Sequence, residues 1–282
     1  MPTQPTSVRV HHTAESPDSS RREDGEAPPP ARLAPRAGGN RRWWLPAAGC
    51  LLLAGLAALS IDMQLARWLA AGYLPELLYD LFHLCEPFGN GLGVLVVLAL
   101  LYQLDPPRRW ALPRVATCAW GAGLSADVVK LLVERARPHS AELADGVWAS
   151  FGAFLPGISA GSAGQSFPSA HTATAFGLAA ALAWLYPVGR RAFFTLAALV
   201  ALQRMASASH FLSDVCCGAA VGLVTARAVL CPGRLLRWFE RIESPWKTLR
   251  KQPLPAGELQ RMRRMQADQA DVGQRKRLDR AA

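Results

Sequence analysis

Three clusters of charged and hydroxyl-bearing residues lie where apolar stretches of this sequence begin or end. They are Lys130 with Arg137-Pro138, then Pro168-Ser169-Ala170-His171, then Arg204 with His210 and Asp214. Ionisable groups are costly near the hydrocarbon core of a membrane, so those kept there are candidates for function. Together the clusters hold cations, histidines, a serine and a carboxylate, which are the groups needed to bind a phosphate and break its ester bond.

The third cluster has the most informative spacing. His210 and Asp214 are four positions apart, so on one helix they would face the same way. A carboxylate that accepts the Nδ1–H of an imidazole fixes its tautomer and leaves Nε2 free as a nucleophile. A His–Asp hydrogen bond is also a common structural feature. Arg204, expected just across a short turn, favours the functional interpretation.

The first cluster fits either an anion site or an ordinary basic helix end. Lys130 and Arg137 are seven positions apart, almost two helical turns, so they could share a face of one helix. Pro138 predicts that this helix ends near Arg137. Asp127, one turn before Lys130, could pair with it. Arg135, between the two cations, is predicted to be a solvated loop charge.

The second cluster is predicted to open a helix. Proline is favoured in a first helical turn, and Ser169 is placed to cap the helix. Free backbone N–H groups at a helix N-terminus bind anions, so the Ser169 hydroxyl and the local amides are candidate phosphate donors. His171 would point from the same turn toward the phosphoryl group. The alternative is that Ser169 only caps the helix and that His171 only lies at the membrane interface. The cluster by itself does not favour either interpretation.

Taken together, the clusters resemble the signature of the type 2 phosphatidic acid phosphatase superfamily. That superfamily includes integral-membrane lipid phosphatases, soluble bacterial acid phosphatases and vanadium haloperoxidases. The motifs that carry the resemblance cover residues 130 to 214. The resemblance implies that fixed cations hold the phosphate oxygens while one histidine attacks phosphorus and forms a phosphohistidine. A second histidine would protonate the leaving oxygen and then activate water. No metal or other cofactor is implied.

These implied roles fall on the matching positions of this sequence. The substrate phosphate would be bound by Lys130, Arg137, Ser169, Ala170 and Arg204. His210 would be the nucleophile, Asp214 would orient it, and His171 would be the acid. The family usually has Gly where Ala170 stands and Ser where Gln203 stands. Alanine keeps the amide donor, and Gln203 would change the support of the adjacent arginine rather than the chemistry.

The hydrophobic pattern predicts an all-α fold, a bundle of six transmembrane helices between disordered polar termini. A crossing needs about 17 to 25 apolar residues. The candidate runs cover roughly residues 43–60, 88–104, 112–133, 169–186, 191–209 and 212–231. The chain then divides into a disordered segment (1–42), a membrane phosphatase domain (43–231) and a basic tail (232–282) with a short helix on the membrane surface.

Basic residues set the expected orientation of these helices. Arg108, Arg109 and Arg114 follow the second run, and Arg190 and Arg191 follow the fourth. The positive-inside rule makes their side cytoplasmic, together with both termini. All three clusters then lie on the external face of what is predicted to be a bacterial inner membrane.

The net charge of +10 raises the question of nucleic acid, but the excess lies in the tails and short loops, and no nucleic-acid-binding motif appears. The expected partners are membrane lipids and a lipid phosphate substrate. The sequence predicts a metal-independent lipid phosphate phosphatase that hydrolyses a phosphomonoester or pyrophosphate of an amphiphile. A phosphotransferase that passes the group to a second lipid is the alternative. An anion transporter is less favoured, because the charged set gathers at one face.

Overall fold

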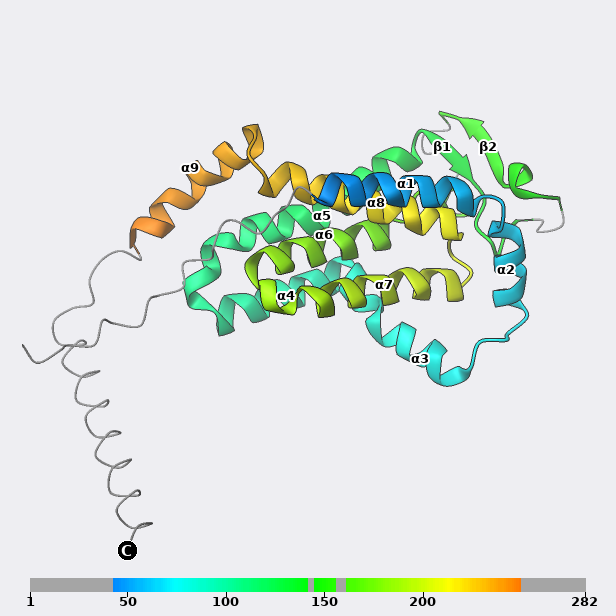
Figure 1. Cartoon of the computed structure of the whole chain (residues 1–282), viewed down its shortest axis with the longest axis horizontal. Helices are drawn as coiled ribbons and strands as arrows, with labels where there is room; N and C mark the ends of the chain where they lie inside the picture. Colours follow the sequence, from blue (N-terminus) through cyan, green and yellow to red (C-terminus); the bar gives the residue numbers. More distant parts are fainter. Residues whose placement is uncertain (1–42, 142–144, 156–160, 250–282) are drawn as a thin grey trace, which may run out of the picture. The chain divides into compact units, whose positions relative to one another are not determined.

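The apolar runs of the sequence form helices in the computed structural model, which describes residues 43–141, 145–155 and 161–249 (Figure 1). The predicted N-terminal segment 1–42 and most of the tail, residues 250–282, lie outside the described residues. In order, the described elements are α1 (Trp44–Ala58), α2 (Asp62–Ala70), α3 (Glu76–Cys85), η2 (Glu86–Gly89), α4 (Gly91–Leu104), η3 (Pro106–Ala111), α5 (Leu112–Lys130), β1 (Val133–Arg135), η4 (Val147–Ser150), β2 (Phe151–Phe154), α6 (Ala170–Leu185), η5 (Pro187–Gly189), α7 (Arg190–Ala206), α8 (Leu212–Leu230) and α9 (Arg234–Leu249).

The chain is mostly helical, as predicted, and α6 lies at the centre of the bundle. It packs against α5, α7 and α8, while α1 lies along α8 (Figure 1). Glycines permit this close approach. A Cβ on Gly177 would lie 2.1 Å from the carbonyl oxygen of Cys118, and one on Gly222 would lie 2.6 Å from that of Ala173. Small residues therefore set the spacing of these helices, as is common between membrane helices.

Six of the helices fall on the six predicted runs, but the number of membrane crossings is not established by them. Among the described helices, Leu212–Leu230 is long and apolar enough to cross a membrane. The number rises to at most three if each of two bent helix pairs is a single crossing. These pairs are α1 with α2, bent by 76°, and α3–η2 with α4, bent by 70°. Several of the others are short: the 15 residues of α1 rise about 22 Å, less than a typical hydrocarbon core.

A small antiparallel sheet, which the sequence analysis did not predict, follows α5. Val133 pairs with Phe154 and Arg135 with Phe151. The prediction that Lys130 and Arg137 share a helix face is therefore wrong. The helix ends at Lys130, and the Arg137 amide donates to the carbonyl of Ala163 (3.0 Å) in the segment before α6. An extended backbone replaces the second helical turn because these loop carbonyls satisfy its amides.

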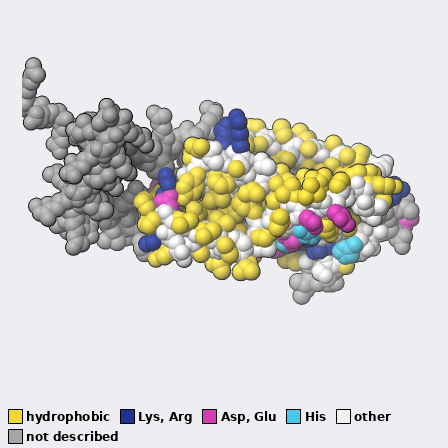
Figure 2. Space-filling model, turned by 90° about the horizontal axis from the view of Figure 1, so that it is seen from below, with side chains coloured by type: hydrophobic (Ala, Val, Ile, Leu, Met, Phe, Trp, Pro, Cys, Tyr) yellow, Lys and Arg dark blue, Asp and Glu magenta, His cyan; other side chains and the backbone are white. Residues whose placement is uncertain are grey.

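One face of the bundle is largely hydrophobic, with charged side chains gathered toward its two ends (Figure 2). Large apolar side chains such as Leu53, Leu92 and Leu124 are well exposed. Exposed apolar area on this scale is characteristic of a surface that contacts lipid or protein rather than water. The charged ends leave an apolar band between them, as a membrane-embedded bundle requires.

Candidate active site

The three polar clusters meet at one end of the bundle. Lys130 closes α5, Ser169 precedes α6, Arg204 lies in the last turn of α7 and Asp214 in the first turn of α8. Successive helices run in opposite directions, so these four helix ends come together. The charges of all three cations, and His210, lie close enough to His171 to act on its ionisation. The structure therefore brings the three clusters together at one end of the bundle, while their joint function stays a prediction.

The third cluster is arranged around a tight turn between α7 and α8. His210 precedes α8 rather than lying on it, and its amide donates to the carbonyl of Arg204 (3.1 Å). Its Nδ1 lies 3.7 Å from Oδ2 of Asp214, longer than a hydrogen bond. Catalytic hydrogen bonds in unliganded sites are often long and tighten when substrate binds. The pair is thus in place for orientation of the imidazole, although not on one helix face as predicted.

The carboxylate of Asp214 is fully buried and held from several directions. Its Oδ2 accepts from the Ser166 hydroxyl (2.6 Å) and from the Phe211 amide (2.9 Å), which caps the first turn of α8. Its Oδ1 accepts from Nη1 of Arg135 (2.5 Å). Ser166 also lies 3.5 Å from Nδ1 of His210, so it stands between the acid and the imidazole. A carboxylate fixed in this way can orient His210 with little freedom.

Arg135 is a site residue that the sequence analysis placed wrongly. It was predicted to be a solvated loop charge, yet its side chain is fully buried. The guanidinium bridges two carboxylates, donating through Nη1 to Asp214 and through Nη2 to Asp62 (2.7 Å). The Cζ atom of Arg135 lies 4.3 Å from the ring centroid of Phe211 and 4.6 Å from that of Phe151.

Asp62, at the start of α2, is the other residue that the sequence analysis missed. It accepts from the Ser213 amide (3.1 Å) and from the Ser213 hydroxyl. The Ser213 hydroxyl also accepts from Nη1 of Arg135 (2.6 Å). Because Ser213 directly precedes Asp214, this network fixes the position of the first turn of α8. Asp62 and Arg135 therefore support the acid that faces His210.

The second cluster forms the N-terminus of α6 as predicted. Ser169 is the N-cap residue, and its hydroxyl accepts from the amide of Thr172 (3.4 Å) and from the Thr172 hydroxyl (3.0 Å). The Ser169 amide donates to the carbonyl of Asp214 (3.1 Å), which ties α6 to α8. Within the described residues, the amides of Ala170 and His171 have no hydrogen-bond acceptor. They are therefore available to an anion at this helix end.

The cations of the site are only partly neutralised by protein groups. Lys130 pairs with Asp127 (2.9 Å), as predicted, and Nη1 of Arg204 donates to Glu86 (3.2 Å). The Nε atoms of Arg137 and Arg204 are buried without a hydrogen-bond partner in the part of the chain that the structure describes. Unsatisfied buried donors are costly, and an anion with several acceptor oxygens would satisfy both.

Gln203 explains how the chain supports Arg204 without the serine that the family pattern has there. Its Nε2 donates to Oε2 of Glu86 (3.2 Å), and its Oε1 accepts from Nη1 of Arg204 (3.4 Å). Gln203 is buried and thus links the arginine to its carboxylate partner. This agrees with the prediction that the substitution changes support of the arginine.

A groove of about 380 Å³ leads away from His171 between η2, α4, α5 and α6. Its walls include Trp120 and Leu124, both exposed apolar side chains, and Asp127 and His171 lie at the polar end. The Trp120 indole donates to the carbonyl of Gly91 (3.3 Å), which holds the ring at the groove wall. A ligand with a polar head and an apolar body fits these surroundings.

The electrostatics of His210 favour a neutral imidazole. Burial lowers its pKa below the ordinary value, Asp214 raises it in part, and the charges of Arg204 and Arg137 lower it again. A neutral imidazole keeps a lone pair on the ring, which nucleophilic attack requires. The site therefore combines a neutral imidazole, a buried carboxylate beside it and a set of cations.

Comparison with known proteins places this geometry in a family context. The family model of the PAP2 superfamily matches residues 110–235. The chain is 40% identical over 79 residues to the lipid A 1-phosphatase of Porphyromonas gingivalis, covering 27% of this chain and 17% of that protein. It is 38% identical over 101 residues to the lipid A 1-phosphatase of Rhizobium johnstonii, covering 36% of this chain and 39% of that protein.

A third relative, the lipid A 1-phosphatase of Rhizobium etli, is 37% identical over 102 residues, or 36% of this chain and 41% of that protein. The matched regions thus span less than half the length of these curated relatives. Among solved structures, the crystal structure of Aquifex aeolicus LpxE is similar at 21% identity and a TM-score of 0.45. It covers 59% of this chain and 92% of that chain.

Proposed function

Because residues 110–235 of this chain match the family model of the PAP2 superfamily, we propose that the protein is a membrane-embedded lipid phosphate phosphatase. The observation that carries the proposal is that the buried Nε atoms of Arg137 and Arg204, beside the two histidines, have no hydrogen-bond partner among the described residues. Such donors suit the equatorial oxygens of a phosphoryl group in transfer, where fixed positive charge stabilises the transition state most.

The proposed reaction has two steps. Nε2 of His210 attacks phosphorus, forming an N–P bond as the P–O bond to the lipid breaks, and the leaving oxygen takes a proton from His171. A water molecule then attacks phosphorus and gives a proton to His171, which releases inorganic phosphate and restores neutral His210. Lys130, Arg137 and Arg204, together with the Ala170 amide, would hold the oxygens throughout.

The groove beside His171 supports an amphiphilic substrate. Its apolar walls would take the lipid body while the phosphate enters the cationic site. The names of the relatives make a phosphorylated saccharolipid of the lipid A class the first substrate to test. Polyprenyl pyrophosphate, phosphatidylglycerol-phosphate-like lipids and phosphatidic acid have the same chemistry and form the comparison panel.

We also propose that the chain crosses a bacterial inner membrane six times, with both termini cytoplasmic and the site on the external face. The alternation of basic loops and the apolar band seen in Figure 2 support this arrangement. Labelling of single cysteines introduced at Ala163 and Arg190 in intact cells tests it. The first should react with an impermeant reagent and the second should not, and the opposite pattern would reverse the topology.

The function is tested by phosphate release from the lipid panel by purified protein in detergent containing a chelator. We expect release without added metal, and loss of at least about 10³-fold in activity for His210→Ala. The matched control is His139→Ala, since His139 is exposed and outside the phosphate-binding set. Full activity in His210→Ala would exclude it as the nucleophile. Labelled phosphate recovered on a second lipid would identify a phosphotransferase instead.

A further inference from the structure

The last helix that the structure describes, α9, carries a basic surface far from His171 and His210. It begins at Arg234, shortly after α8 ends at Leu230, so it starts where the candidate membrane span stops. The reactive cluster is at the other end of α8, about 28 Å away along its 19 residues. Any ligand of α9 is therefore separate from the phosphate-binding site.

The orientation of α9 is fixed by buried contacts. Glu243 is buried and forms a two-pronged ion pair with Arg114 of α5, with Nη2 to Oε2 at 2.7 Å. The Arg114 guanidinium lies 5.7 Å from the ring centroid of Phe239, which is also buried. Arg114, which the sequence analysis counted among the basic residues that set the orientation of the helices, is thus an internal anchor. The side of α9 that carries Phe239 and Glu243 packs against the bundle. These contacts fix which side chains of α9 remain exposed.

The exposed surface of α9 carries two neighbouring stripes. The apolar stripe consists of Leu235, Trp238 and Ile242, and the basic stripe consists of Arg234, Arg237 and Arg241. In each stripe the spacing is three and then four residues, which keeps its members on one side of a helix. Glu240 is the exposed acidic side chain of this segment. The stripes make α9 strongly amphipathic, with a positive polar side.

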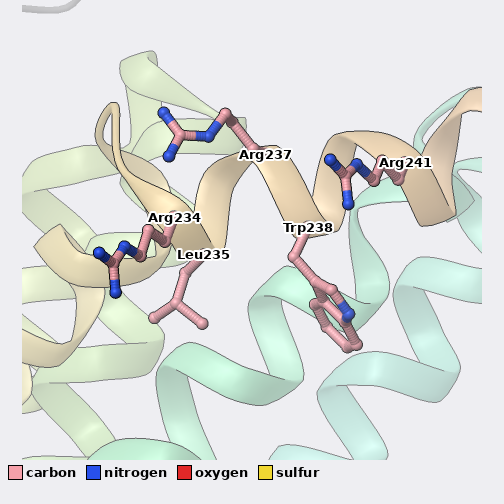
Figure 3. A pocket seen from close by; sticks show the side chains of 5 residues that line it. All are labelled: Arg234, Leu235, Arg237, Trp238 and Arg241. Atoms are coloured by element: carbon pink, nitrogen blue, oxygen red, sulfur yellow. The ribbon is translucent and has the colours of Figure 1, made fainter.

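Arginine and tryptophan side chains of the two stripes line a shallow pocket of about 580 Å³ (Figure 3). Leu235 and Trp238 point to the same side of α9, whereas Arg237 points to the opposite side (Figure 3). An indole beside guanidinium groups suits the boundary between the hydrocarbon layer and the lipid head groups. The indole ring enters the apolar layer there, and each guanidinium can donate two hydrogen bonds to one phosphate.

We propose that α9 lies in the membrane surface and binds the phosphate head groups of anionic phospholipids through Arg234, Arg237 and Arg241, with Leu235 and Trp238 inserted among the upper acyl chains. The position of α9 directly after the candidate span brings it to this depth. The three positive charges supply the complementarity. Each arginine near an anionic surface strengthens binding about fivefold.

The test is the retention of phosphatidylglycerol by the full-length protein in neutral detergent micelles, measured by native mass spectrometry. Phosphatidylglycerol is a phosphodiester, so it is not a substrate for phosphomonoester hydrolysis. We expect the Arg237→Gln/Arg241→Gln variant to bind it about 25-fold more weakly, and phosphatidylcholine to bind weakly to every variant. The charge-matched control is Arg190→Gln/Arg191→Gln, which removes two exposed arginines at the start of α7 and should change binding less than about twofold.

Any of three outcomes would overturn the proposal. The first is an equal loss of binding in both double variants, which would indicate net charge rather than a site. The second is displacement of the lipid by inorganic phosphate at equal concentration, which would indicate a soluble anion as the ligand. Phosphate release from the proposed substrate should persist in the α9 variant and shows that it folds. In the unaltered protein, raising the salt concentration from about 0.1 to 1 M should weaken lipid retention, and unchanged retention would contradict the charged contact.

Discussion

Arg135→Met removes the cation that lies between two buried carboxylates. Its partners, Asp62 and Asp214, are both fully shielded from solvent, as is the guanidinium itself. Removing one member of a buried ion pair leaves charge uncompensated and typically costs 3–5 kcal/mol of unfolding free energy. Since one guanidinium neutralises two acids here, we expect a loss toward the upper end, about 5 kcal/mol.

The matched control for this substitution is Arg108→Met. Arg108 pairs with Asp105 near the surface, with 32% and 17% of the two side chains exposed, so its loss should cost about 1 kcal/mol or less. Urea unfolding in mild detergent, followed by far-ultraviolet circular dichroism, gives both values. Arg135→Met/Asp62→Asn should recover part of the loss, because one unpaired charge disappears with the cation.

The same variant has a kinetic consequence. Without Arg135, Asp214 keeps its hydrogen bonds from Ser166 and Phe211 but loses the one on Oδ1. We expect kcat to fall while KM for the lipid phosphate changes little, because the cations that bind phosphate are untouched. A stability loss below about 1 kcal/mol for Arg135→Met would refute the reasoning, since a fully buried bridging cation cannot be that dispensable.

Three further predictions concern packing, acidity and the helix N-terminus. Gly218→Ala should destabilise the protein by about 1–3 kcal/mol, because the new Cβ would lie 2.4 Å from the Ser169 carbonyl oxygen. Gly121→Ala is the control, since the nearest atoms to its Cβ would lie at 3.7 Å, and it should be neutral or stabilising in the same urea titration. The acid limb of the kcat/KM profile should lie below about pH 6.5, because burial lowers the pKa of His210 and activity is lost only as the pH falls through that lowered value. Asp214→Asn should move this limb to still lower pH and reduce kcat about 10³–10⁴-fold. An acid limb above pH 7 in the unaltered protein would contradict this prediction. Ala170→Gly, which restores the residue usual in the family, should change kcat/KM less than about threefold in the phosphate-release assay, since the amide donor is kept.

Much of the candidate site follows from short-range sequence patterns. The spacing of Arg204, His210 and Asp214 identifies a turn and the start of a helix, and Pro168-Ser169 identifies a capped helix N-terminus. Alternation of helix direction then brings these ends together. The joint site was predicted on this basis, although the catalytic roles of its members stay predictions.

The remainder depends on contacts that no local pattern specifies. Asp62 and Arg135 are 73 positions apart and meet only after α2 folds against the segment that follows α5. Lys130 and Arg137 were placed on one helix because their spacing fits two turns, but strand pairing with residues 151–154 overrides that preference. Residues two apart share a face in extended chain, so the spacing of Arg135 and Arg137 was the available signal that both enter the site.

The proposed mechanism requires that His210 carries the phosphoryl group, and chemical trapping of the intermediate can show this. His171→Ala should slow release of phosphate from the enzyme, while a labelled aryl phosphate, whose leaving group needs little protonation, still allows the first step. We expect an acid-labile, base-stable label on His210 after rapid quenching, and no label in His171→Ala/His210→Ala. A label on another residue, or turnover with no trapped label in either variant, would contradict it.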